Sequence, residues 1–226
     1  MPEENRAGGC LVSPGTVGAV VLAAGAGSRM GHRPKCLLEL NGVPLIQRLL
    51  MALSVAGIDE HVLVLGHHAE RIEPAVRDFT VNVVRNAVPD AGQVSSLRLG
   101  LRALSSKVDT VLIALTDLPL LDAPDIVDLL DAYRMRPEGT LVVQPHVEGL
   151  PGNPVVFCSK VREEILGSNA VVGCKQWQVD NPCKVHRWTS NNPHYRVDVD
   201  SPQDLESLAV LTGLRLRWPI DLQDPM

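Results

Sequence analysis

The chain has few aromatic residues and no surplus of positive charge. Aromatic side chains make up only 3% of its 226 residues, so aliphatic side chains must build the core, which is typical of parallel strands buried on both faces. The formal net charge of -5 provides no basic field for nucleic acid and no polybasic patch for anionic lipid. We therefore expect a small-molecule partner, with no nucleic acid and no membrane.

Long apolar runs and paired cysteines are also missing. No apolar run approaches the roughly 20 residues that a membrane span requires, and the opening stretch MPEENRAGGCLVSPG lacks the hydrophobic segment of a signal peptide. The five cysteines form no CxxC pair, so neither a disulfide framework nor a zinc ribbon is indicated. We predict a cytoplasmic protein whose residues 1–16 are a disordered lead-in.

The chain does have an alternation of apolar strands and amphipathic helices. The run 17–24 is apolar and stops at Gly25, which is typical of a buried central strand. A helix with one apolar face is expected between Pro44 and Gly57. The alternation then predicts strands over 61–65, 81–85, 110–115 and 140–144, and helices over 69–77, 95–104 and from Asp122 onward. This rhythm indicates a single doubly wound, mostly parallel α/β sheet of the Rossmann-like type, in one domain over residues 17–226.

Periodicity weakens after Glu148. A turn and a short strand are expected in GLPGNPVVF, and the Asn/Pro-rich stretch 167–193 shows little regular pattern. We interpret residues 146–195 as a small acceptor-side insertion that covers the site. A strand over 195–199 and a helix capped by Ser201 are expected to close the domain.

A glycine-rich, cationic segment, LAAGAGSRMGHRPK, leaves the first strand. Its small residues let backbone N–H groups approach phosphate oxygens, and its basic side chains oppose the charge of a polyphosphate. The other interpretation is a glycine turn flanked by surface charges. We predict that this segment binds a nucleoside triphosphate through Leu22, Ala23, Ala24, Gly25, Ala26, Gly27, Ser28, Arg29 and Lys35.

Two commoner phosphate motifs do not fit this segment. Its glycines lack the G-x-G-x-x-G spacing, and the second strand ends in Gly66-His67-His68 instead of a carboxylate that could bind a ribose hydroxyl. No glycine precedes Lys-Ser or Lys-Thr at the Walker spacing. Adjacent residues of an extended chain point to opposite sides, so we interpret His67 and His68 as a solvated loop.

Two aspartates are candidates for a metal site. Asp117 follows an apolar strand, at the edge where open α/β sheets bind ligands, and Asp200 can reach the same edge. Two carboxylates with waters and phosphate oxygens make the octahedral oxygen site that Mg²⁺ prefers. We predict Mg²⁺ on Asp117 and Asp200, with Asp198 as the fallback ligand. The alternative is that these aspartates only cap a turn and the last helix.

The segment 22–45, read as LAAGAGSRMG-x-x-PK-x-L-L-E-L-x-G-x-P-L, resembles the signature of the MobA-like nucleotidyltransferases. Further matches follow in the family's order and span about 17–209. They are Asn86 with Gly92-Gln93-Val94-Ser95-Ser96-Leu97, similar to the nucleoside-side loop; Thr116-Asp117-Leu118-Pro119, similar to the metal aspartate; Gly152-Asn153-Pro154, similar to the acceptor turn; and Asp198-Val199-Asp200-Ser201-Pro202, similar to the closing D-x-D-[ST]-P motif.

The resemblance implies a fold of the nucleotide-diphospho-sugar transferase type and transfer of a nucleoside monophosphate to a small phosphorylated acceptor. It implies nucleotide contacts from Asn86, Gly92, Ser95 and Ser96, acceptor contacts from Gly152, Asn153, Pro154 and Lys175, and catalytic roles for Arg29, Lys35 and Asp117. The A-A-G of the first loop is more similar to the cytidylyltransferases that act on molybdopterin, which implies CTP, a molybdopterin acceptor, and a molybdoenzyme or chaperone as partner.

Two departures keep other functions open. Asn153 stands where the family usually has histidine, and the family's second acceptor motif has become Ala170-Val171-Val172-Gly173, which removes a carboxylate. The segment RPKCLLELNGVPL also resembles transferases that act on sugar phosphates or phosphocholine. An alternative function of another class is that of a nucleotide-binding or redox protein without transfer activity.

Overall fold

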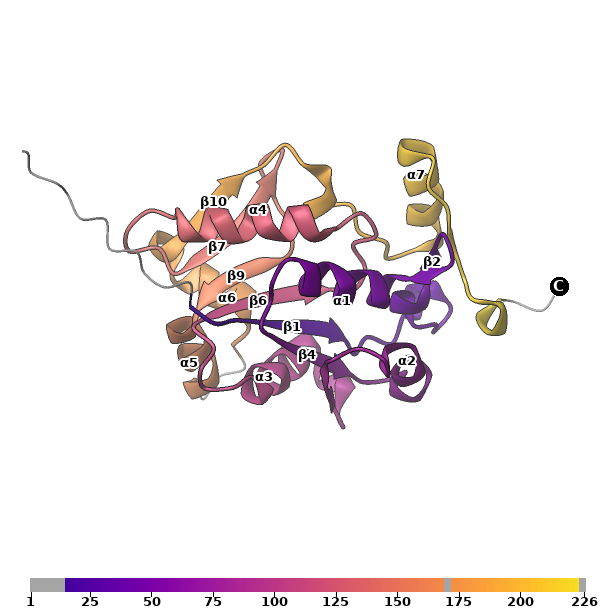
Figure 1. The fold of residues 1–226 in the computed structure, drawn as a ribbon, viewed down its shortest axis with the longest axis horizontal. Helices are drawn as coiled ribbons and strands as arrows, with labels where there is room; N and C mark the ends of the chain where they lie inside the picture. Colours follow the sequence, from indigo (N-terminus) through magenta and orange to yellow (C-terminus); the bar gives the residue numbers. More distant parts are fainter. Residues whose placement is uncertain (1–14, 169–171, 224–226) are drawn as a thin grey trace, which may run out of the picture.

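The computed structural model describes residues 15–168 and 172–223, so residues 1–14 of the lead-in expected over 1–16 lie outside the described residues. Its main sheet has the strand order β10-β7-β9-β6-β1-β4-β5, with β8 paired to β7 (Figure 1). Only β9 runs antiparallel to its neighbours along this order. The prediction of a doubly wound, mostly parallel sheet is therefore confirmed. The strands are β1 (Val17–Ala23), β4 (Glu60–Leu65), β5 (Asn82–Arg85), β6 (Thr110–Leu115), β7 (Val142–Val147), β8 (Leu150–Pro151), β9 (Val155–Cys158) and β10 (Val185–Thr189).

Helices cover both faces of this sheet. Alternate residues of β1 pack against opposite helix layers, with Ala19 and Val21 in one core and Val20 and Leu22 in the other, which is why the whole strand is buried. One face carries α1 (Leu45–Val55), α2 (Ala69–Val76) and α4 (Ala123–Arg134), and the other carries α3 (Gln93–Ala103), α5 (Ser159–Gly167) and α6 (Cys174–Asp180) (Figure 1).

A third, smaller core sits at the carboxyl edge of the main sheet. It joins the short sheet of β2 (Glu39–Leu40), β3 (Val43–Pro44) and β11 (Leu216–Arg217) to α7 (Pro202–Thr212). Met30, Val199 and Leu208 are buried together in this core. It therefore holds the segment before α7 against the loop that follows β1. The cap expected for this helix is confirmed, because Ser201 and Asp204 form a capping box.

Two expectations for the second half of the chain are wrong. Residues 167–193 are not irregular throughout, since they contain all of α6 and all of β10. The strand expected over 195–199 is absent, because 193–195 form the short helix η5 (Pro193–Tyr195) and 197–200 are irregular. Val199 is buried by packing against the third core, so its apolar character reflects that contact and not a strand. The functional assignment and boundaries of 146–195 stay predictions.

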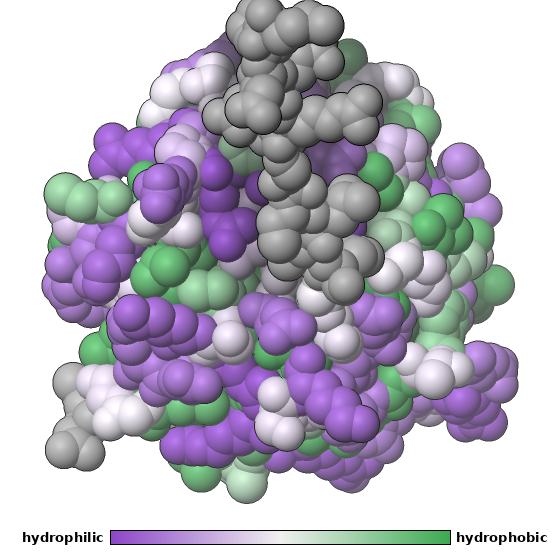
Figure 2. Space-filling model, turned by 60° about the vertical axis from the view of Figure 1, so that its left-hand side comes forward, coloured by the Kyte–Doolittle hydropathy of each residue, from purple (hydrophilic) through white to green (hydrophobic). Residues whose placement is uncertain are grey.

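Within the described residues, no helix is both long and apolar enough to cross a membrane. Figure 2 shows one side of the molecule, on which hydrophobic residues form small, separate patches among hydrophilic ones wherever the grey atoms leave the surface visible.

Candidate active site

Three segments far apart in the sequence meet at the carboxyl edge of β1 and β6. The Val199 N–H donates to the Asp117 carbonyl at 2.9 Å, which brings the segment before α7 beside the end of β6. The Lys35 ammonium lies 3.0 Å from Asp117 Oδ2 and also contacts Asp200 Oδ1. Arg29 Nη2 lies 2.7 Å from Asp200 Oδ2. The structure therefore brings together all the residues expected to carry charge in catalysis.

The charges of this cluster depend on one another. Burial opposes the charged form of Lys35, but Asp117 and Asp200 outweigh it and raise the pKa of the lysine. Burial also opposes ionisation of Asp200, and hydrogen bonds and charge from Lys35 and Arg29 overcome that effect and lower its pKa. The pKa of Asp198 is raised, first by burial and then by the two neighbouring carboxylates. Lys35 thus serves as the shared ion-pair partner of Asp117 and Asp200.

The residues at this edge fit a divalent cation. Asp117 Oδ1 is buried and has no hydrogen-bond partner among the described residues, so one carboxylate oxygen is available to a cation. Asp200 supplies further oxygens beside it, and hard cations such as Mg²⁺ take oxygen ligands. Asp198 is less easily ionised than Asp200, which agrees with a secondary place in the ligand set. The ligand set itself stays a prediction.

The loop between β1 and Lys35 turns sharply and exposes one side. Gly27 has φ 62°, and a Cβ there would lie 2.0 Å from the Arg33 carbonyl oxygen, so only glycine fits. The short helix η1 (Ser28–Met30) begins at this turn. A Cβ at Gly25 would meet nothing within 4 Å. The loop is therefore packed at Gly27 and open at Gly25, where a ligand has room to approach the backbone.

His67 is exposed and His68 half-buried in the turn after β4, which agrees with the solvated loop expected there, but both rings also contact the first loop. His67 Nδ1 lies 3.1 Å from the Ala24 carbonyl oxygen, and His68 Nε2 lies 3.0 Å from the Ala26 carbonyl oxygen. Both imidazoles thus bind the first loop on either side of Gly25. Sequence reasoning missed these contacts because they join residues about 42 positions apart, and the only local signal was two polar residues at the end of a central strand.

The expected nucleoside-side residues form a second cluster at the start of α3. The Asn86 amide nitrogen donates to Ser95 Oγ at 2.8 Å and to Ser96 Oγ at 2.9 Å. Its amide oxygen accepts from the Val88 N–H at 3.0 Å. Gly92 has φ 89° and precedes the first residue of the helix. Asn86 therefore fixes the turn that leads into α3, and a nucleotide contact from these residues stays a prediction.

The expected acceptor turn is held by the chain on both sides. The Gly152 N–H donates to the Pro145 carbonyl and the Asn153 N–H to the Tyr195 carbonyl, each at 2.8 Å. A Cβ at Gly152 would lie 2.6 Å from the Tyr195 carbonyl oxygen, so the close approach requires glycine. This turn is therefore fixed by β7 on one side and by η5 on the other.

A cavity of about 1070 Å³ lies on one face of the sheet between α3 and α6. Of the four residues expected to contact the acceptor, Asn153 and Lys175 line this cavity, while Gly152 and Pro154 are not part of its lining. Arg187 lines it as well and was missed by sequence reasoning. Among the described lining residues the charged side chains are Lys175 and Arg187, and none is a carboxylate. Lys35, Asp117 and Asp200 do not line the cavity. Leu22 and Leu115 do line it, and they lie at the carboxyl ends of β1 and β6, the strands whose edge carries the charged cluster.

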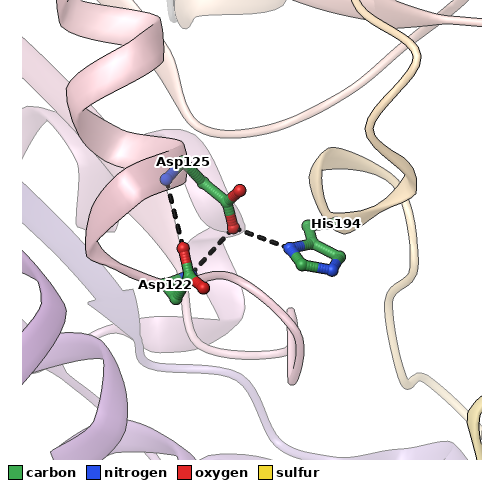
Figure 3. Close-up of side chains that lie close together, drawn as sticks. All are labelled: Asp122, Asp125 and His194. Carbon is green, nitrogen blue, oxygen red and sulfur yellow. Dashed lines mark hydrogen bonds and ion pairs between the residues drawn. The ribbon is translucent and has the colours of Figure 1, made fainter.

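Three further side chains of the kinds that bind metal ions lie close together, with their potential ligand atoms within 4.8 Å of one another (Figure 3): Asp122, Asp125 and His194. Each is engaged in holding the chain. The two aspartates form the capping box of α4, and Asp125 Oδ2 also lies 2.9 Å from His194 Nδ1. Asn192 Nδ2 donates to Asp125 Oδ1 at 2.5 Å, and the Tyr195 hydroxyl donates to the Asp125 carbonyl at 2.7 Å. This cluster fastens η5, which supports the acceptor turn, to α4.

Comparison with known proteins places the chain in a family. The model of the MobA-like NTP transferase domain matches residues 19–179. The chain is similar to a nucleotidyl transferase from Methanothermobacter thermautotroptrophicus, with 26% identity, a TM-score of 0.70, and coverage of 85% of this chain and 95% of that one. In fold it also resembles 4-diphosphocytidyl-2C-methyl-D-erythritol synthase from Anaerococcus prevotii, with 18% identity, a TM-score of 0.68, and coverage of 88% and 96%.

Among curated proteins, the chain is 36% identical over 131 residues to the bifunctional protein GlmU of Mycobacterium avium. This match covers 54% of this chain and 26% of that protein. The chain thus spans about a quarter of the length of the curated relatives that it matches. The family model, in contrast, covers more than half of this chain and includes the glycine-rich loop, Lys35 and Asp117. The chain belongs to the MobA-like NTP transferase domain family, a family of nucleotidyltransferases.

Proposed function

We propose that the protein transfers CMP from CTP to a small phosphorylated acceptor and releases pyrophosphate. The observation that carries this proposal is the meeting of Arg29 and Lys35 with Asp117 and Asp200 beside a cavity whose described lining residues include no carboxylate. Such an edge can neutralise a polyphosphate, hold a divalent cation and admit a second anionic substrate. Molybdopterin is the acceptor we favour, on the basis of the first-loop sequence.

In the proposed complex the triphosphate lies over residues 22–28, with its phosphate charge opposed by Arg29 and Lys35. Asn86, Gly92, Ser95 and Ser96 shape the turn on the nucleoside side. Asp117 and Asp200 would hold Mg²⁺, which supplies Lewis-acid charge to the reacting phosphate when bound. Without nucleotide, Lys35 neutralises the two aspartates; with nucleotide, its ammonium is available to the departing pyrophosphate.

The proposed reaction needs no nucleophilic side chain. A phosphate oxygen of the acceptor attacks the α-phosphorus of CTP in line, the bond from that phosphorus to the bridging oxygen of the β-phosphate breaks, and the bond's electrons leave with pyrophosphate. The chain contributes by orienting both substrates and by placing Arg29 and Lys35 where negative charge develops. The first loop, which is packed at Gly27 and open at Gly25, leaves its backbone accessible to the triphosphate.

The charges in the cavity favour an anionic acceptor. Lys175 and Arg187 are placed to pair with phosphate oxygens, and apolar side chains such as Val94 and Val155 line other parts of the wall. A phosphocholine acceptor would bring its quaternary ammonium into a wall that has no carboxylate among its described residues, so a sugar phosphate is the stronger alternative. A cytoplasmic location and a molybdoenzyme or chaperone partner complete the proposal.

The direct test is an acceptor screen with the purified full-length chain, Mg²⁺ and each of CTP, GTP, ATP and UTP. Pyrophosphate release is measured with molybdopterin, with sugar phosphates and with phosphocholine. We expect release with CTP and molybdopterin, and release with another pair would correct the substrates while supporting nucleotidyl transfer. Nucleotide binding without release for every pair would favour a nucleotide-binding or redox protein without transfer activity.

A further inference from the structure

His67 links the two loops between which the proposed nucleotide would lie. Its Nδ1 lies 3.1 Å from the Ala24 carbonyl oxygen of the first loop, and its Nε2 lies 2.9 Å from Asp90 Oδ1. Asp90 belongs to the short helix η3 (Pro89–Ala91), which immediately precedes Gly92 and α3. One imidazole therefore spans from the phosphate side of the proposed site to its nucleoside side.

The backbone beside this imidazole is tightly packed against both loops. A Cβ at Gly66 would lie 2.6 Å from the Ala24 carbonyl oxygen and 2.9 Å from Pro89 Cβ. The residue that follows β4 thus lies between the first loop and η3, and there is no room for a side chain larger than that of glycine at this position. The backbone of the following residue, His67, therefore starts beside both loops, and its exposed ring reaches each of them.

The two contacts of His67 require a charged ring. A carbonyl oxygen and a carboxylate oxygen are both acceptors, so each ring nitrogen must carry a proton, which makes the ring an imidazolium. The hydrogen bond to Ala24 raises the pKa of His67 above its ordinary 6.5, burial opposes the rise, and Asp90 adds to it. Around the ring, η3 contributes Asp90, the first loop contributes a carbonyl, and the adjacent titratable group is His68, whose ring centroid is 6.5 Å away.

His68 provides an internal contrast. Its one such contact, from Nε2 to the Ala26 carbonyl at 3.0 Å, needs only one N–H, which a neutral imidazole supplies. The loop is therefore held at Ala26 whatever the charge of His68. Its hold at Ala24, together with the link to η3, depends on the charge of His67.

We propose that His67 is a positioning residue which, as an imidazolium, locks the phosphate-binding loop to the turn before α3 and so preorganises the site for nucleotide. This inference rests on the proposed function of the two loops. Because the pKa of His67 is raised in the folded chain, the lock is complete below about pH 6.5 and is lost as pH rises through that raised pKa. Loss of the lock frees the loop to adopt other positions, and the free energy needed to order the loop on binding then weakens the affinity for nucleotide.

The lock itself is tested without nucleotide by NMR titration of the histidine rings in the full-length chain. His67 is assigned from the His67→Gln variant, and its pKa is expected above 6.5 and lower in Asp90→Asn. Exchange of the backbone amide hydrogens of residues 24–28 and 90–92 is expected to quicken in His67→Gln. A pKa for His67 at or below 6.5, or unchanged exchange, would overturn the lock.

Its effect on nucleotide is tested by calorimetric titration with CTP and Mg²⁺ at pH 6 and pH 8.5, comparing variants at the same pH so that the ionisation of CTP cancels. We expect His67→Gln to weaken binding about tenfold at pH 6 and clearly less at pH 8.5, and His67→Arg, which keeps a cation with several donors, to recover part of the affinity at both. His186→Gln is the matched control. An equal loss at both pH values would leave only a structural role and overturn the proposal.

These tests separate the two claims. If CTP does not bind the wild type, the same comparison is made with whichever of GTP, ATP and UTP does. If none of the four binds, the proposed function fails, while the histidine titration and the hydrogen exchange still decide whether His67 locks the loops.

Discussion

The carboxyl edge of β1 and β6 contains charged side chains of both signs, whereas the charged side chains that line the cavity between α3 and α6 are basic. At the edge, cations and carboxylates meet within hydrogen-bond distance and set each other's ionisation. In the cavity, two cations face open space, and the described lining includes no carboxylate. An edge of mixed charge can organise a triphosphate and a metal ion, whereas a wall of one sign selects an anion. Under the proposed function, the edge would carry out the chemistry and the cavity would select the acceptor.

The largest effect is expected from removing the metal-side carboxylate at the edge. Asp117→Ala should lower kcat at least about a hundredfold, or about 2.7 kcal/mol, because a charge clamp of the transition state is lost. Steady-state pyrophosphate release measures this. Asp131→Ala, which removes an exposed carboxylate paired with Arg134 on α4, is the matched control and should leave kcat unchanged. Near-normal turnover in Asp117→Ala would remove this residue from the mechanism and blur the contrast between the regions.

A smaller effect is expected from the support under the acceptor turn. Asp125→Ala should lower the free energy of unfolding by about 2 kcal/mol, because the capping box of α4 is lost and the hydrogen-bonding groups of Asn192 and His194 lose their partner. Denaturant unfolding measures the change. Asp128→Ala, an exposed position on the same helix, should have little effect. Equal stability of both variants would show that η5 is held by other contacts.

The smallest effect is expected from the cavity wall. Arg187→Ala should raise KM for the acceptor about tenfold, about 1.4 kcal/mol, with kcat little changed, since a charge-assisted contact to a bound anion is removed. The Kd for nucleotide, measured by calorimetry, should stay constant. Arg134→Ala, on the surface of α4, is the control. An unchanged acceptor KM, or a matching loss of nucleotide affinity, would mean that the two regions do not divide the substrates in this way.

How well the chain could be interpreted from sequence differs between the same two regions. The edge is marked by local signals, since a glycine-rich loop after an apolar strand and an aspartate at the end of another are recognisable in single segments. The buried strand β1 and the capping box of α7 were likewise predictable, because period and cap chemistry are local.

The cavity could not be predicted in the same way. Arg187 contributes because β10 runs parallel to β7, with Arg187 opposite Gln144, and this pairing joins residues far apart in the chain. His67 acquires its role only when the end of β4 packs against the first loop. The strand expected over 195–199 was wrong because alternating apolar residues also occur where an irregular segment packs on a core.

The central claim is that phosphate oxygens of a nucleotide are bound between the cationic loop and a divalent cation on Asp117 and Asp200. A crystal structure of the full-length chain with CTP and Mg²⁺ tests it most directly. We predict triphosphate oxygens in contact with Arg29 and Lys35, and the cation on the two aspartates in the place of their contact with Lys35. Nucleotide bound elsewhere, with Arg29 and Lys35 still paired to the aspartates, would contradict the account.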